Sequence, residues 1–204
     1  MRDLLDIRPA VLFALLCLLT WLLLYIKQNF IIMEMAAFEI LEERGQLGVF
    51  RIFAALQFLS VPAVYLYKFS LIALVLWLGC FAWGYRVTYF SCWQIALAAE
   101  IVFIVPELLK IAWFMVVQTD PEFWDVRSFY PLSLMHFFDY SQIDGKWHYP
   151  LKALNAFEVL YWLMLVAGVH VRADKSYARA SAIVFTSYVA VFLAWLVYYL
   201  IIYK

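Results

Sequence analysis

The stretch AVLFALLCLLTWLLLYI, residues 10–26, decides the fold, because almost every side chain in it is apolar. An α-helix rises about 1.5 Å per residue, so crossing a hydrocarbon core of about 30 Å takes about 20 predominantly apolar residues. The run reaches this length by continuing through Lys27, Gln28 and Asn29 to Phe30, since a lysine near a helix end can extend its ammonium to the headgroups. The sequence therefore predicts a membrane-spanning helix over residues 10–30.

The composition of the whole chain also indicates a lipid environment. Of its 204 residues, 68% are hydrophobic, 20% aromatic and 15% charged, and the mean hydropathy is +0.86. A soluble globular domain carries more charge and fewer apolar residues than this. The formal net charge is zero, so no basic excess attracts nucleic acid. We therefore expect an integral membrane protein whose first partner is the lipid bilayer and which binds no nucleic acid.

Arg2 and Arg8 precede the first apolar run, as they would in a signal peptide. Residues 22–30 contain no small side chain that could form a cleavage site, and further apolar runs follow. We therefore expect the first span to be retained.

Five or six stretches of the chain are long and apolar enough to span, which predicts an all-α, polytopic transmembrane bundle forming one domain over residues 1–204. The predicted spans are residues 10–30, 50–67, 69–85, 92–117, 151–171 and 180–203. Lys68 separates the second and third of these, which predicts a tight hairpin turning there, with Pro62 kinking its first arm. Each arm is short, so one could be re-entrant, and the count stays between five and six.

Two segments between the spans are too polar to cross the bilayer. Residues 31–47 mix several glutamates with apolar side chains, which predicts an interfacial helix. The short basic loop at residues 172–179 favours a cytoplasmic location for its side, although with six spans seven lysines and arginines fall on each side. The basic-residue count alone therefore leaves the orientation open.

Several ionisable and polar residues fall within the predicted spans, where each charge costs about 2.5 to 3.5 kcal/mol by insertion scales. Glu100 and Glu107 lie within about 20° of each other on one helical face, and Lys110 is an i,i+3 neighbour of Glu107. Asn155 and Glu158 share a side of the next span. These five residues predict an intramembrane polar network. It could fix helix packing or contact a partner subunit, or it could line a proton or cation path.

The segment 118–150 mixes acidic and aromatic side chains, which suits a boundary between membrane and water. We predict that it forms a partner-binding loop, with contacts made by Trp124, Phe129, Tyr130, His136, Asp139, Asp144, Trp147 and His148. Four of these, His136, Asp139, Asp144 and His148, could in principle ligate a metal, but their spacing matches no common motif. The three cysteines form no C-x-x-C pair. We therefore predict no metal and no cofactor.

Signatures of common membrane-embedded and lipid-processing enzymes do not occur in the sequence. It contains no G-x-S-x-G elbow, no paired-histidine metalloprotease motif and no phosphate-cradling glycine loop. We therefore expect a protein that is not an enzyme.

Two stretches resemble a known family. GYRVTYFSCWQ (residues 84–94) and YPLKALNAFEVLYW (residues 149–162) each lead into an apolar span, and together they resemble the bacterial Yip1-domain membrane proteins. The resemblance covers residues 50–203 and implies about five spans, a hairpin of close helices and a bacterial inner-membrane location. The aspartate-leucine-tyrosine-glycine-proline signature of the eukaryotic members, which bind small GTPases, is missing. No catalytic residue is carried over.

Two functions follow from these observations. The resemblance implies an accessory or scaffold subunit that binds other integral membrane proteins, in protein export or traffic. The alternative is a small secondary transporter or channel that uses Glu100, Glu107 and Glu158 to handle ions.

Overall fold

The computed structural model describes residues 1–32, 47–119, 121 and 123–203, and within these ranges every regular element is a helix. The all-α prediction is therefore confirmed. Most of the predicted interfacial helix, residues 33–46, lies outside the described residues. The elements in chain order are α1 (Arg2–Asp6), α2 (Pro9–Lys27), η1 (Gln28–Ile32), α4 (Leu47–Ala82), α5 (Tyr89–Ala99), η2 (Glu100–Phe103), α6 (Ile104–Val116), α7 (Phe123–Ser128), η3 (Leu134–Phe137), α8 (Gly145–Ala153), α9 (Ala156–Ala173), α10 (Tyr177–Val184), η4 (Phe185–Val189) and α11 (Ala190–Ile202).

Four helical stretches of the described chain are long and apolar enough to cross a membrane. They are Pro9–Ile32, Ile52–Ala82, Ala156–Ala173 and Tyr177–Ile202. Large apolar side chains on them point outward: Leu59, Phe81 and Ile201 are 77%, 72% and 73% exposed. Many large apolar side chains exposed along the same helices are unfavourable in water and mark a lipid-facing surface. The helices are therefore compatible with a membrane-embedded protein, as predicted.

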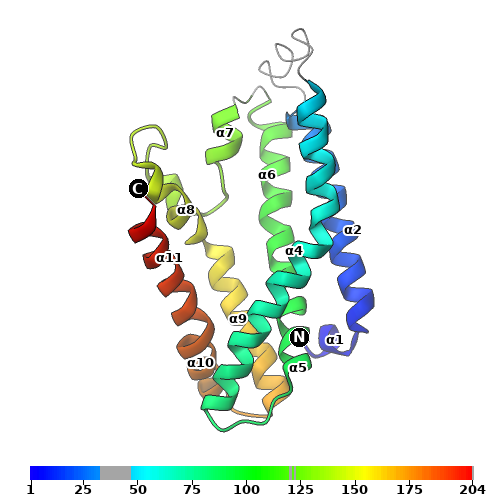
Figure 1. Cartoon of the computed structure of the whole chain (residues 1–204), viewed down its shortest axis with the longest axis vertical. Coiled ribbons are helices and arrows are strands. Elements are labelled where there is room, and N and C mark those ends of the chain that lie inside the picture. Colours follow the sequence, from blue (N-terminus) through cyan, green and yellow to red (C-terminus); the bar gives the residue numbers. More distant parts are fainter. Residues whose placement is uncertain (33–46, 120, 122, 204) are drawn as a thin grey trace.

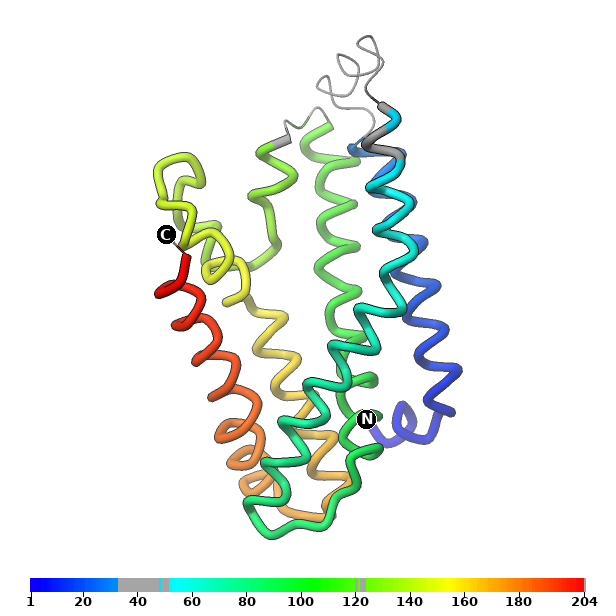
Figure 2. The backbone as a smooth tube through the Cα atoms, viewed as in Figure 1, coloured from blue at the N-terminus to red at the C-terminus, as the bar shows by residue number. Residues whose placement is uncertain are grey.

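The predicted hairpin at Lys68 is wrong, because α4 is one uninterrupted helix of 36 residues. No glycine adjoins Lys68 to form a turn, and its ammonium binds a buried carboxylate of the bundle at 2.6 Å instead of leaving the membrane for water. Pro62 lies inside the helix, which changes direction along its length without breaking (Figure 2). The two short arms, residues 50–67 and 69–85, are thus halves of one long span.

The predicted span over residues 92–117 corresponds to three consecutive helical pieces, α5, η2 and α6, which form one rod (Figure 1). The pieces change from α to 3-10 geometry at Glu100–Phe103. Pro106, early in α6, has no backbone N–H to donate to the preceding turn. A proline at this position explains why the regular α-helical pattern is interrupted just before it.

The helices run alternately between two ends of the molecule, which we call the basic end and the loop end. The basic end holds the N-terminus and the short connections at residues 83–88 and 174–176 (Figure 1). The loop end holds α7, α8 and the C-terminus (Figure 1). Because Lys68 lies inside a helix, the six-span count of basic residues no longer applies.

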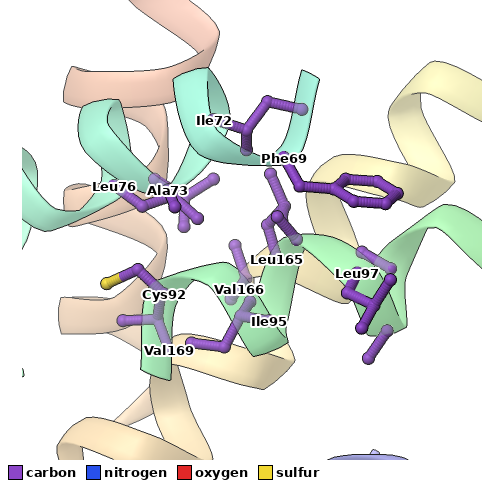
Figure 3. Packing of buried hydrophobic residues seen from close by; sticks show 14 of the residues in the cluster. Phe69, Ile72, Ala73, Leu76, Cys92, Ile95, Leu97, Leu165, Val166 and Val169 are labelled. Carbon is purple, nitrogen blue, oxygen red and sulfur yellow. The ribbon is translucent and has the colours of Figure 1, made fainter. Parts of the chain in front are cut away.

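A continuous apolar core fills the half of the bundle near the basic end, and Figure 3 shows the packing of part of it from close by. Phe69, Leu76, Ile95 and Leu165, from α4, α5 and α9, have no exposed surface. The helices approach closely here: a Cβ atom added at Gly168 would lie 2.4 Å from a side-chain carbon of Ile95. Small residues allow such close packing where lipid supplies no hydrophobic driving force between helices.

Candidate functional site

A polar cavity of about 560 Å³ lies in the loop-end half, between α2, α4, the η2–α6 rod, α8, α9 and α11. We call it the chamber. Three glutamates and three lysines line it: Glu100, Glu107, Glu158, Lys27, Lys68 and Lys152. Its volume lies within the range of about 300 to 1,000 Å³ that is typical of ligand cavities. A chamber with balanced charges between apolar helices can hold a polar or zwitterionic group.

The shortest ion pair of the chamber joins α4 to the rod. Lys68 Nζ lies 2.6 Å from Glu100 Oε1 and 4.7 Å from the centre of the Phe103 ring. Glu100 is only 3% exposed, and its second oxygen, Oε2, is buried without a hydrogen bond from any described residue. Glu100 thus keeps one acceptor atom unused in the interior of the protein.

Glu158 has hydrogen-bond donors but no cationic partner. Its position is set by Asn155, whose Oδ1 caps α9 by accepting the Glu158 N–H at 2.8 Å. Trp162 Nε1 and the Tyr188 hydroxyl donate to Glu158 Oε1 at 2.9 and 3.1 Å. No lysine or arginine of the described chain forms an ion pair with it. The Glu158 carboxylate is therefore held in place by two neutral donors, and its charge is not neutralised by an ion pair.

Glu107 and Lys110 are not paired with each other in the structure. Glu107 Oε2 lies 3.5 Å from Lys27 Nζ on α2. Lys110 lies outside the chamber, where its ammonium donates to the backbone carbonyls of Val126 and Phe129, the latter at 2.9 Å. Lys110 thus attaches the rod to α7. Of the five residues of the predicted network, the chamber brings together the other four, the three glutamates and Asn155.

Lys152, on α8, supplies a positive charge at the loop end of the chamber. It donates to the backbone carbonyl of Arg127 and lies 5.0 Å from the Tyr140 ring. Burial lowers the pKa of its ammonium, and the nearby Arg127 charge adds to this effect. No carboxylate of the described chain pairs with Lys152. Lys152 and Glu158 are therefore the two charges of the chamber that have no ion-pair partner.

The chamber is closed towards the basic end. On the basic-end side of Glu100, the core residues Phe69, Leu97 and Leu165 have no exposed surface. They belong to one continuous cluster. Within the described residues, no polar passage therefore joins the chamber to the basic end. This geometry fits a one-sided binding cavity better than an open channel.

The predicted partner-binding residues fall into two groups in the structure. Tyr130 lines the chamber, and Phe129 packs on Trp113 and Phe114 of the rod. The others form local contacts on the outside. Asp139 accepts bonds from Ser141 and Gln142, Asp144 pairs with Lys146 at 2.9 Å, and His148 stacks on Tyr140. Trp124, Trp147 and His136 lie at the loop end, the two tryptophans with exposed side chains.

The described residues contain no cluster of three or more histidine, cysteine, aspartate or glutamate side chains placed to bind a metal. His136, Asp139, Asp144 and His148 are thus not gathered into a metal site. The sequence pattern placed Lys68 in a turn, predicted that Lys27 reaches the headgroups, and gave no role to Lys152 or Tyr188, so none of the four was expected at this site. Of the contacts that the sequence analysis missed, only the hydrogen bond from Trp162 to Glu158 could have been predicted from the sequence, because Trp162 is the i+4 neighbour of Glu158 on α9.

No protein-family model, curated protein or solved structure matches the chain. The resemblance to Yip1-domain proteins therefore stays a prediction, and the chamber is the feature of the molecule from which a function can be inferred.

Proposed function

We propose that the protein crosses a bacterial inner membrane five times, with the α5–η2–α6 rod as the fifth crossing beside the four candidate spans. The rod extends between the same two ends as the other helices (Figure 1), and its residues Leu108 and Val116 are exposed apolar side chains. An odd number of crossings puts the two termini on opposite sides. The short connections at the basic end, which carry Arg86 and Lys175, face the cytoplasm under the positive-inside rule.

The function that the chamber supports best is that of a small secondary transporter, which binds a small charged group from the loop-end side and moves it across the membrane. The observation that carries this proposal is the presence of Glu158 and Lys152, two charges without ion-pair partners, in the wall of one cavity. Glu158 lies in a candidate span, and ionisable groups at membrane depth are costly and mark ligand or ion pathways. A bound group with charges of both signs would supply the missing partners.

The closed core towards the basic end favours a transporter over a channel. A channel needs a continuous polar path, whereas a transporter exposes its site to one side at a time. The structure would then correspond to the state open to the loop end. Release on the other side requires the tightly packed contacts of α4, α5 and α9 to separate.

Uptake of labelled phosphoethanolamine or of labelled neutral amino acids into proteoliposomes tests this function. We expect the wild-type protein to give a response above that of empty liposomes. Glu158→Gln should abolish the response, since glutamine removes the charge but keeps an acceptor for the two donors. Glu100→Gln should abolish it as well. Asp174→Asn is the matched control: Asp174 lies at the basic end with a positive φ that asparagine tolerates, so its response should equal the wild type. A wild-type response no larger than that of empty liposomes refutes transport.

A scaffold role is the second candidate, favoured by exposed aromatic side chains at the loop end. Phe137 is 81% exposed, and the neighbouring Phe138 is also exposed. Exposed aromatic residues are typical anchors of protein interfaces. Under this proposal, Phe137→Ser combined with Phe138→Ser releases a membrane protein that copurifies in mild detergent, while the chamber is untouched. An unchanged set of copurifying proteins contradicts it.

A further inference from the structure

A second cavity, of about 450 Å³, adjoins the chamber. We call it the groove. It lies between α4 and α11 and shares a wall with the chamber, formed by Lys68, Phe103, Tyr149, Glu158 and Phe192. Apart from this wall it is lined mainly by apolar and aromatic side chains. The same carboxylate, that of Glu158, therefore borders a polar space on one side and an apolar space on the other.

The groove opens towards the lipid. The two helices that form its sides diverge from the basic end towards the loop end (Figure 1), and both belong to candidate membrane spans. Leu71 on α4 and Val191 and Trp195 on α11 line the groove and are exposed on the outer surface. A molecule in the bilayer could therefore enter from the side, without passing through water.

We propose that the ligand of the chamber is a phospholipid with an ethanolamine-type headgroup, whose headgroup occupies the chamber and whose acyl chain occupies the groove. This inference depends on the proposed function, because it assumes that the chamber is a binding site. A polar cavity joined to an apolar groove at lipid depth matches an amphiphile. A fully water-soluble ligand would occupy the chamber and leave the apolar groove empty.

The charges of the chamber select the headgroup. Two ion pairs, Lys68–Glu100 and Lys27–Glu107, are internally balanced, which leaves the Glu158 carboxylate and the Lys152 ammonium to pair with a ligand. An anionic lipid would satisfy only Lys152, whereas a zwitterion with an amine and a phosphate satisfies both.

Hydrogen bonding favours a primary amine over a quaternary one. Both donors to Glu158 bind its Oε1, so Oε2 accepts no hydrogen bond from the described residues, and Glu100 Oε2 has none either. A primary ammonium has three N–H donors that can reach such oxygens, while a trimethylammonium has none. Ethanolamine therefore fits better than choline.

Native mass spectrometry of the protein in dodecylmaltoside tests the proposal with an equimolar mixture of dioleoyl phosphatidylethanolamine, phosphatidylcholine and phosphatidylglycerol. We expect the wild type to retain phosphatidylethanolamine about tenfold more than either competitor. Glu158→Gln should remove this preference. Leu71→Trp, which fills the groove, should lower phosphatidylethanolamine retention about tenfold.

Leu78→Trp is the matched control for the groove variant. Leu78 lies two turns further along α4 on the same face, is 50% exposed compared with 49% for Leu71, and lines neither cavity. We expect it to retain lipid like the wild type. Lipid retained without headgroup preference, or lost equally in both tryptophan variants, overturns the proposal.

A second measurement separates this inference from the proposed function. Thermal unfolding in detergent is followed with soluble phosphoethanolamine, which carries the headgroup without acyl chains. If phosphoethanolamine stabilises the protein while the lipid preference is missing, the chamber binds a solute and the lipid inference falls alone. If neither phosphoethanolamine nor phosphatidylethanolamine binds, both proposals fall together.

Discussion

Removing Lys68 should destabilise the protein more than removing the charge of its partner Glu100. Lys68→Met keeps an unbranched side chain of similar length but leaves the Glu100 carboxylate without a counter-charge. The side chain of Glu100 is 4% exposed, whereas that of Lys68 is 36% exposed. An unpaired lysine here therefore keeps part of its side chain exposed, whereas an unpaired glutamate stays buried.

The loss of unfolding free energy in Lys68→Met has an upper limit, because the unpaired Glu100 carboxylate can take up a proton. Breaking a buried ion pair by removing one partner costs about 3 to 5 kcal/mol. The carboxylate can instead be neutralised, which costs at most about 4 kcal/mol at about pH 7.4 for a glutamate whose pKa in the unfolded chain is about 4.3. We expect Lys68→Met to lower the unfolding free energy by about 3 to 4 kcal/mol. Two pH units lower, the limit falls to about 1.5 kcal/mol, so the loss should shrink accordingly.

Glu100→Gln should cost less, about 1 to 2 kcal/mol, because glutamine still accepts a hydrogen bond from Lys68 and leaves no buried charge. The double variant, Lys68→Met with Glu100→Gln, should be more stable than Lys68→Met alone, since it has no buried carboxylate without a counter-charge. The assay is equilibrium unfolding by sodium dodecyl sulfate in dodecylmaltoside micelles, followed by near-UV circular dichroism. A double variant less stable than Lys68→Met, or a loss independent of pH, would refute the reasoning.

Three further predictions concern helix packing, capping and a surface carboxylate. Gly168→Ala should lower the unfolding free energy by about 1 to 3 kcal/mol through overpacking, since its Cβ would lie 2.4 Å from a side-chain carbon on α5. Gly48→Ala is the control and should be neutral in the same unfolding assay, because a Cβ there would meet nothing within 4 Å. Asn155→Ala should cost about 1 kcal/mol by removing the cap of α9, also measured by unfolding. Hydrogen bonds from Ser141 hold the pKa of Asp139 below its ordinary value. The stabilisation is thus present above the ordinary pKa and lost as pH falls through the lowered one, and Ser141→Ala should move the midpoint of an NMR titration upward.

Each of these predictions has an outcome that contradicts it. Equal stability of the two alanine variants would mean that the helices are not in close contact at Gly168. An unchanged unfolding free energy for Asn155→Ala would remove its role as a cap, and an unmoved Asp139 midpoint would exclude the Ser141 hydroxyl as a cause of the shift.

The sequence predicted the all-helical fold and the apolar stretches well, because hydropathy over about 20 residues depends only on local composition. It failed at Lys68, where a charge inside an apolar run suggested a turn. Whether such a charge leaves the membrane or stays depends on a partner, and Glu100 is 32 residues away in the chain. Local patterns contain no information about that partner.

The candidate site was predictable to a similar extent. The glutamates of the chamber were identifiable because carboxylates are rare in apolar runs, and Asn155 because it stands three residues before Glu158. The lysines that balance them come from α2, α4 and α8. Their convergence depends on how the helices cross, which the sequence pattern does not specify.

The length of α4 has a mechanical consequence. Its 36 residues measure about 54 Å, against a hydrocarbon thickness of about 30 Å. Such a long helix must tilt in the bilayer, protrude from it or do both, and the amount of tilt relative to protrusion changes with bilayer thickness. Since α4 forms one side of the groove, we expect a thinner membrane to increase the lean and change the width of the opening, so that the host bilayer itself would regulate access.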